Sequence, residues 1–232
     1  MTPTDLAARI DHTALKPETT RADAMKLVSE ALEHGFASVC VNGCFVDAVA
    51  EKLEGTGVKT CGVAGFPLGA MRTTILAIEA SNLAKAGAQE IDFVAHVPHL
   101  LAADAESARA EFAEVVRAVR EVRASAVVKV ILETAVLLAG VDADEAERRI
   151  EAACTAARRS GCDFVKTSTG FHPAGGASAE AVRLLKKHAG PMRVKASGGI
   201  RTHDDAMTML AAGADRLGCS ASVAIVQGAA AG

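Results

Sequence analysis

Short apolar runs alternate with longer segments of helical periodicity along the whole chain. The short runs predict eight β-strands, at positions 9–12, 38–41, 59–65, 90–94, 127–133, 163–167, 193–196 and 216–218. Between two of these runs, apolar residues recur at the i, i+3, i+4, i+7 spacing of one buried helix face, namely Phe112, Val115, Val116 and Val119. The pattern therefore predicts repeated strand–helix units, which is typical of a parallel sheet covered by helices.

The number of units favours a closed barrel over an open sheet. A doubly wound sheet usually has fewer strands and a G-x-G-x-x-G fingerprint after the first one, and no such fingerprint follows positions 9–12. Eight units in 232 residues are close to the length of one (β/α)8 barrel. We therefore expect an α/β protein with the (β/α)8 (TIM) barrel fold, formed as one domain by residues 1–232, with a short helix within residues 1–10.

The amino-acid composition limits the kinds of binding partner and the cellular location that we expect. Half of the residues are hydrophobic and 23% are charged, as in globular proteins. The net charge is −3 and neither Tyr nor Trp is present, so a nucleic-acid partner has little support. No apolar run approaches the roughly 18 residues of a membrane span, and the N-terminal segment lacks the apolar stretch of a signal peptide. These features predict a cytoplasmic protein with small-molecule substrates and no membrane partner.

Two lysines lie within predicted strands, where lysine is rare. Lys166 follows an apolar run at 163–165, and Lys195 lies between Val194 and Ala196. Burial and the proximity of a second cation both favour the neutral form of an amine, which can attack an aldehyde and form a Schiff base. The alternative is that each lysine pairs with a carboxylate such as Asp92 or Asp11 and has no chemical role. Two such lysines on neighbouring units favour the catalytic interpretation.

Small residues follow the last two predicted strands. Ser197, Gly198 and Gly199 come after the seventh strand, and Gly218 and Ser220 lie at the end of the eighth. The loops at this end of a (β/α)8 barrel, with the helix N-termini that follow them, commonly bind phosphate through backbone N–H groups. Simple tight turns are the alternative interpretation.

A metal site is the weaker reading of the histidines. Four of them fall near predicted strand ends: His12, His96, His99 and His172. Their spacing matches neither H-x-H nor H-E-x-x-H, so no two rings are fixed on one face. We expect histidines that form hydrogen bonds or face solvent, and no metal.

Six segments, in order along nearly the whole chain, resemble the signatures of the deoxyribose-phosphate aldolases. They are DHTALKP at 11–17, SVCVN at 38–42, GFPLG at 65–69, EID at 90–92, FVKTSTG at 164–170 and VKASGGI at 194–200. The resemblance implies a class I aldolase without a cofactor. Such an enzyme reversibly cleaves 2-deoxy-D-ribose 5-phosphate into D-glyceraldehyde 3-phosphate and acetaldehyde during deoxynucleoside breakdown.

The resemblance also assigns roles to residues. Lys166 would form the Schiff base, Lys195 would keep it unprotonated and assist proton transfer, and Asp92 would accept the proton of the C3 hydroxyl through water. The resemblance and the strand-end positions together place ten residues around the substrate: Asp11, Thr13, Cys40, Lys129, Thr167, Gly170, Gly198, Gly199, Gly218 and Ser220.

The chain departs from the family pattern at three places. Many relatives have a second serine where Ala221 follows Ser220, and some have a lysine where Phe171 stands. Both changes remove a phosphate donor, which leads us to expect better tolerance of non-phosphorylated aldehydes. Certain members also use a C-terminal tyrosine for proton transfer, and this chain has no Tyr, so water would act instead.

Two alternatives to the aldolase remain open at this point. One is a metal-dependent barrel enzyme that uses the histidines. The other is a non-catalytic phosphosugar-binding barrel in which Lys166 only pairs with a carboxylate. A homodimer is a possible assembly in each case.

Overall fold

The computed structural model describes residues 1–230 and forms a closed barrel of eight parallel strands in the order β1 to β8. All eight predicted strands are present, and the predicted (β/α)8 fold is confirmed. The strands are β1 (Ile10–Ala14), β2 (Ser38–Val41), β3 (Lys59–Ala64), β4 (Glu90–Val94), β5 (Val127–Ile131), β6 (Phe164–Lys166), β7 (Arg193–Ser197) and β8 (Arg216–Cys219).

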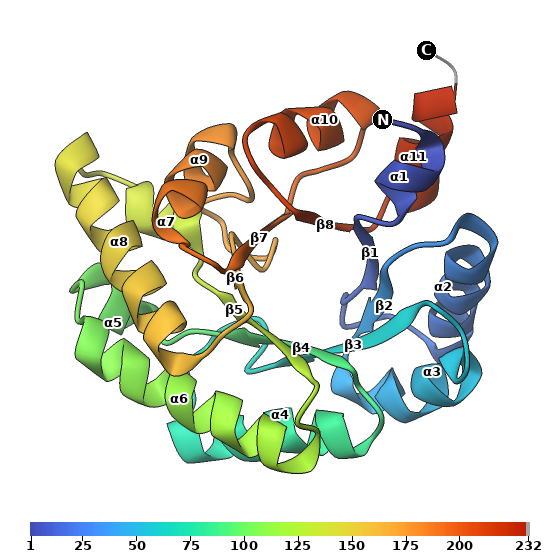
Figure 1. Ribbon diagram of the computed structural model, residues 1–232, viewed down its shortest axis with the longest axis horizontal. Helices are drawn as coiled ribbons and strands as arrows, with labels where there is room; N and C mark the ends of the chain where they lie inside the picture. The colour runs from blue at the N-terminus through green and yellow to red at the C-terminus, as the bar shows by residue number, and fades with distance from the viewer. Residues whose placement is uncertain (231–232) are drawn as a thin grey trace.

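Helices surround the barrel as an outer ring (Figure 1). They are α1 (Pro3–Ala7), α2 (Arg21–His34), α3 (Val46–Leu53, after the 3-10 turn Gly43–Phe45), α4 (Thr73–Lys85), α5 (Val97–Leu101), α6 (Ala105–Val122), α7 (Thr134–Leu138), α8 (Ala143–Ser160), α9 (Ala179–His188), α10 (His203–Ala211) and α11 (Ser222–Ala230). The predicted N-terminal helix is α1, which packs against α11 and so brings the first and last helices together (Figure 1).

Local sequence explains where the covering helices begin and end. The Asp142 side chain accepts a hydrogen bond from the backbone N–H of Glu145 and begins α8, and Gly161 ends this helix in the left-handed conformation that glycine adopts without a steric penalty. The apolar stripe predicted on α6 is buried against the barrel. No helix in residues 1–230 combines the length and the apolar character that a membrane crossing requires.

Three strands end earlier than the sequence pattern suggested, and one of them, predicted to reach position 167, stops at Lys166. The predicted strand at 127–133 stops at Ile131, because Glu133 has a left-handed backbone (φ 54°) and α7 begins at the next residue. The strand predicted to reach position 65 ends at Ala64, because Gly65 has a φ of 65°. The end of the chain, where some relatives have the tyrosine, lies partly outside the described residues.

Candidate active site

Three lysines converge on one buried carboxylate inside the barrel. Asp92 Oδ2 lies 2.8 Å from Lys166 Nζ and 2.7 Å from Lys195 Nζ, and Asp92 Oδ1 lies 2.7 Å from Lys129 Nζ. The strand register creates this arrangement, because it pairs Asp92 with Lys129 across β4 and β5 and Lys166 with Lys195 across β6 and β7. None of the four side chains is more than 3% exposed.

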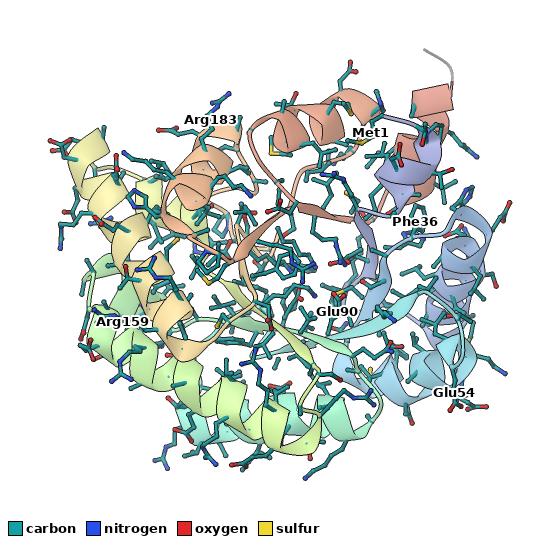
Figure 2. All side chains as sticks on the ribbon, in the orientation of Figure 1. Met1, Phe36, Glu54, Glu90, Arg159 and Arg183 are labelled. Carbon is teal, nitrogen blue, oxygen red and sulfur yellow. The ribbon has the colours of Figure 1, made fainter. Side chains whose placement is uncertain are left out.

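Two further carboxylates and an arginine complete the cluster. Asp11 contacts Lys195 at 2.5 Å and Arg216 at 2.6 Å, and Glu90 contacts Lys129 at 2.6 Å. Figure 2 shows Glu90 inside the ring of strands, whereas Glu54, Arg159 and Arg183 point outward from the covering helices. The cluster therefore draws on β1, β4, β5, β6, β7 and β8.

The cluster holds one more cation than anion. When every member is ionised, three carboxylates face four cations, which leaves one excess positive charge in a buried site. Its members are Asp11, Glu90, Asp92, Lys129, Lys166, Lys195 and Arg216. An uncompensated charge is costly to bury, so the excess positive charge favours the loss of one proton from the group.

The surroundings of each group determine which protons are held tightly. Burial alone would raise the pKa of Asp92, but the ammonium groups of Lys129, Lys166 and Lys195 outweigh it and hold this pKa well below its usual range. Burial alone would lower the pKa values of Lys129 and Lys195, but the adjacent carboxylates raise both. The sequence-based expectation that burial and a neighbouring cation would favour the neutral amine in both strand lysines is therefore wrong for Lys195, because Asp11 and Asp92 both contact it.

A cavity of about 630 Å³ opens above the cluster at the carboxyl ends of the strands. Lys166 is the one cluster member among the residues found to line it, so its Nζ connects the buried charges with the cavity. Six of the ten predicted substrate-binding residues also line the cavity: Thr13, Gly170, Gly198, Gly199, Gly218 and Ser220.

The other four predicted substrate-binding residues lie outside the lining of this cavity. Asp11, Cys40, Lys129 and Thr167 are fully buried. Asp11 and Lys129 belong to the charge cluster, and Thr167 Oγ1 accepts a hydrogen bond from the backbone N–H of Ser197. These four residues therefore lie beneath the cavity and do not form its wall.

Two glycines are required by close packing at the site. A Cβ atom at Gly218 would lie 3.1 Å from Lys195 Cε, so glycine leaves room for this lysine between β7 and β8. A Cβ atom at Gly198 would lie 3.0 Å from the Cα atoms of Gly170 and Gly176, so the loops after β6 and β7 pack backbone to backbone.

The histidines do not converge on one point. His12 is buried and bonds Ser222 Oγ at 2.9 Å and Glu30 Oε2 at 2.7 Å, while the His96 and His99 rings pack edge to face with centroids 4.8 Å apart. Within residues 1–230, the one group of three potential metal ligands is Cys40, Cys61 and Asp92, which contains no histidine. Three ammonium groups already contact Asp92, so a metal cation would meet strong repulsion there.

The sequence analysis missed several residues of the site. Lys16 and Arg201 line the cavity, and Arg201 directly follows the predicted phosphate-binding stretch that ends at Ile200. Glu90 and Arg216 are the first residues of their strands and point into the barrel. Lys59 and Arg193 also begin their strands but are exposed, so a charged first residue does not by itself indicate an inward side chain.

The fold and the site define a (β/α)8-barrel protein with a buried lysine–carboxylate cluster beneath a cavity at the carboxyl ends of its strands. Residues 6–232 match the family model described as "DeoC/LacD family aldolase". The chain belongs to this family of aldolases.

Relatives with a specific name support the same assignment. The chain is 47% identical over 224 residues to a deoxyribose-phosphate aldolase of Caldanaerobacter subterraneus subsp. tengcongensis, covering 96% of this chain and 93% of the relative. It is 48% identical over 224 residues to the Bacillus subtilis protein of that name, covering 96% and 95%. A solved structure described as a tetrameric deoxyribose phosphate aldolase from Aeropyrum pernix superimposes with a TM-score of 0.87 at 36% identity, covering 97% and 91%.

Proposed function

We propose that this protein is a deoxyribose-phosphate aldolase that cleaves 2-deoxy-D-ribose 5-phosphate to D-glyceraldehyde 3-phosphate and acetaldehyde through a Schiff base on Lys166. The observation that carries the proposal is the position of Lys166, which joins a buried cluster with one excess cation to the open cavity. The family and its named relatives point to the same activity.

The charge count explains why Lys166 is the nucleophile. Lys195 contacts two carboxylates and Lys129 contacts Asp92 and Glu90 closely, whereas Lys166 contacts Asp92 alone. Lys166 therefore has the fewest anionic partners among the three lysines of the cluster, and it is the one that lines the cavity. The neutral amine then faces the cavity, where an aldehyde can reach it.

The reaction follows from this arrangement. The Lys166 amine adds to C1 of the open-chain sugar, and loss of water gives an iminium. The C2–C3 bond breaks as its electron pair moves toward the iminium nitrogen, and the C3 hydroxyl loses its proton to leave D-glyceraldehyde 3-phosphate. Protonation of the enamine at C2 and hydrolysis then release acetaldehyde and restore Lys166.

Asp92 is a weaker proton acceptor than the family resemblance implies. Its low pKa and its four close donors, which are the three lysines and the Cys61 thiol at 3.3 Å, oppose protonation. Conversion of Lys166 to an iminium removes donors from Asp92 Oδ2 and frees one acceptor position. We infer that Asp92 chiefly orients Lys166 and Lys195 and carries the C3 hydroxyl proton only transiently.

The phosphate seat lies on the same cavity. Gly198, Gly199 and Ser220 line the cavity, and Arg201 adds a guanidinium to that lining. Arg201 therefore supplies a positive charge to a cavity that is also lined by Phe171, the position at which some relatives have a lysine. This charge favours phosphorylated substrates and so opposes the tolerance of non-phosphorylated aldehydes that the sequence led us to expect. That tolerance remains a prediction.

Reductive trapping tests the proposal. Borohydride treatment in the presence of acetaldehyde should add the mass of one ethyl group to Lys166, and Lys166→Ala should abolish both this adduct and turnover while the protein stays folded. Lys52→Ala, at an exposed helix position, is the matched control and should behave like the wild type. A wild-type protein that binds deoxyribose 5-phosphate but forms no adduct would support the binding-protein alternative instead.

We also propose that the protein is cytoplasmic and self-associates. Apolar side chains are exposed on the loop before α4 and along its first turns, with Leu68 77% exposed, Ile75 52% exposed and Ile78 56% exposed. The Aeropyrum pernix relative is described as a tetramer. Sedimentation should give a species larger than the monomer, and Ile75→Glu combined with Ile78→Glu should shift it to the monomer; a wild-type monomer would contradict the proposal.

A further inference from the structure

Glu133 has a backbone conformation that glycine normally occupies. Its φ and ψ are 54° and 53°, in the left-handed region, and the residue is only 2% exposed. It lies between β5 and α7, outside the charge cluster. Because this conformation disfavours a side chain, the retention of a buried carboxylate here requires a local role.

The Glu133 carboxylate holds the segment that follows β6. Thr169 Oγ1 donates a hydrogen bond to Glu133 Oε2 at 2.7 Å, and the Thr169 backbone N–H lies 3.3 Å from both carboxylate oxygens. Thr169 Oγ1 in turn accepts a hydrogen bond from the backbone N–H of Phe171 at 3.1 Å. One carboxylate therefore fixes three consecutive residues of the chain.

These three residues form part of the cavity wall. Thr169, Gly170 and Phe171 all line the cavity, and the Phe171 ring packs edge-on against Phe66 with centroids 5.3 Å apart. Gly170 packs closely against Gly198, where a Cβ atom on Gly170 would lie 3.2 Å from Gly198 Cα. The position of this segment therefore also sets the position of the loop after β7, which carries the proposed phosphate seat.

Lys166 is held by groups other than the Glu133 carboxylate. Its backbone carbonyl accepts a hydrogen bond from Leu132 N, and its side chain is fixed by Asp92. We propose that Glu133 is a positioning residue that acts through Thr169 to fix the 169–171 wall and the adjoining phosphate seat, without a part in the chemistry at Lys166. The inference rests on the proposed function, since it assumes a phosphorylated substrate.

Isosteric substitutions of threonine test this role without opening a cavity. Thr169→Val removes the hydroxyl that bridges Glu133 and Phe171, and Thr169→Ser restores it. Thr134→Val is the matched control, because Thr134 is also buried and its hydroxyl has no hydrogen-bond partner within residues 1–230. Glu133→Gln removes the charge and leaves the size unchanged.

We expect Thr169→Val to raise KM for deoxyribose 5-phosphate about tenfold or more while kcat falls less than about threefold. The rate of acetaldehyde trapping on Lys166 should stay within about threefold of the wild type. Thr169→Ser should restore KM, Thr134→Val should leave it unchanged, and Glu133→Gln should raise it.

Different failures are distinguishable. If the wild type does not trap acetaldehyde, the proposed function fails. If the wild type traps it but Thr169→Val leaves KM unchanged, or if Thr134→Val raises KM equally, the role of Glu133 is refuted. A parallel loss of trapping and substrate affinity in Thr169→Val would show a general structural effect and would also overturn the inference.

Discussion

A single carboxylate organises the chemistry at the scale of individual residues. Asp92 is contacted by Lys129, Lys166 and Lys195, so it both compensates their charge and fixes the Lys166 nitrogen at the floor of the cavity. Burial of such a group is favourable only while its partners remain in place, because an unpaired buried charge is strongly destabilising. Asp92 is therefore important for stability as well as for activity.

Asp92→Asn tests this double role. The amide keeps the size but leaves three buried ammonium groups with one anion fewer, so we expect unfolding to become easier by about 3–5 kcal/mol. We expect kcat/KM to fall by at least about 100-fold, because Lys166 loses its orienting partner. Urea unfolding and steady-state kinetics measure the two effects, with the exposed Asp144→Asn as control; a variant retaining a tenth of the activity would contradict the assignment.

The sequence predicted the central residues of the buried cluster but not their full surroundings. Lys166 and Lys195 stood out because lysine within an apolar strand is rare, and Asp92 was identified through the family resemblance. Glu90 and Arg216 were missed, because their inward direction depends on how the strands of the closed barrel align, which no local pattern reveals. The pairing that raises the pKa of Lys195 was underestimated for the same reason.

At the scale of secondary-structure elements, the repeated strands and long helices were predictable from the sequence, and the short helices α5 and α7 were not. The eight strands and the apolar face of α6 followed from periodicity. The helices α5 and α7 have five residues each, which is too short for a periodic signal. The helix α5 follows His96, whose backbone N–H bonds the buried Glu111, and α7 follows the left-handed Glu133, so both depend on features that local periodicity does not reveal.

Glu111 makes the junction of α5 and α6 sensitive to pH. It is buried and accepts a hydrogen bond from the backbone N–H of His96 at 3.0 Å, and burial raises its pKa from 4.5 to about 7. The folded state therefore keeps a proton that the unfolded chain has already lost between these two values. The contribution of Glu111 to stability is fully present below pH 4.5 and is lost as the pH rises to 7.

Glu111→Gln should remove this dependence, because the amide can still accept the His96 hydrogen bond. Above pH 7 the variant should be more stable than the wild type by about 2–3 kcal/mol, and below pH 4.5 the two should be similar. Urea unfolding at both ends of this range measures the difference. Glu114→Gln, on the same helix and less buried, is the control and should not gain stability in this way. Equal stability of the wild type and Glu111→Gln at every pH would disprove the shift.

At the scale of the whole molecule, closure of the barrel brings together charges that are far apart in the sequence. Asp11 on β1 and Arg216 on β8 are 205 positions apart and in contact at 2.6 Å. The cluster's excess cation is therefore a property of the complete barrel. If this charge balance makes Lys166 reactive, removal of any one of the other cations should change the reactivity of its amine.

Lys129→Met tests this idea at a distance from the substrate. Lys129 is fully buried and is not among the residues that line the cavity. Its removal leaves three carboxylates and three cations, so the excess positive charge of the cluster is lost. We expect acetaldehyde trapping at pH 7 to fall by about tenfold or more and to recover about one to two pH units higher.

The recovery at high pH separates charge balance from structural damage. Loss of packing around Lys129 would lower trapping at every pH, whereas loss of one positive charge moves the pH dependence without changing its maximum. Lys129→Arg keeps the charge and should retain the pH dependence of the wild type wherever it folds. If trapping by Lys129→Met stays low at all pH values, Lys129 serves the fold alone and the excess-charge explanation for Lys166 is wrong.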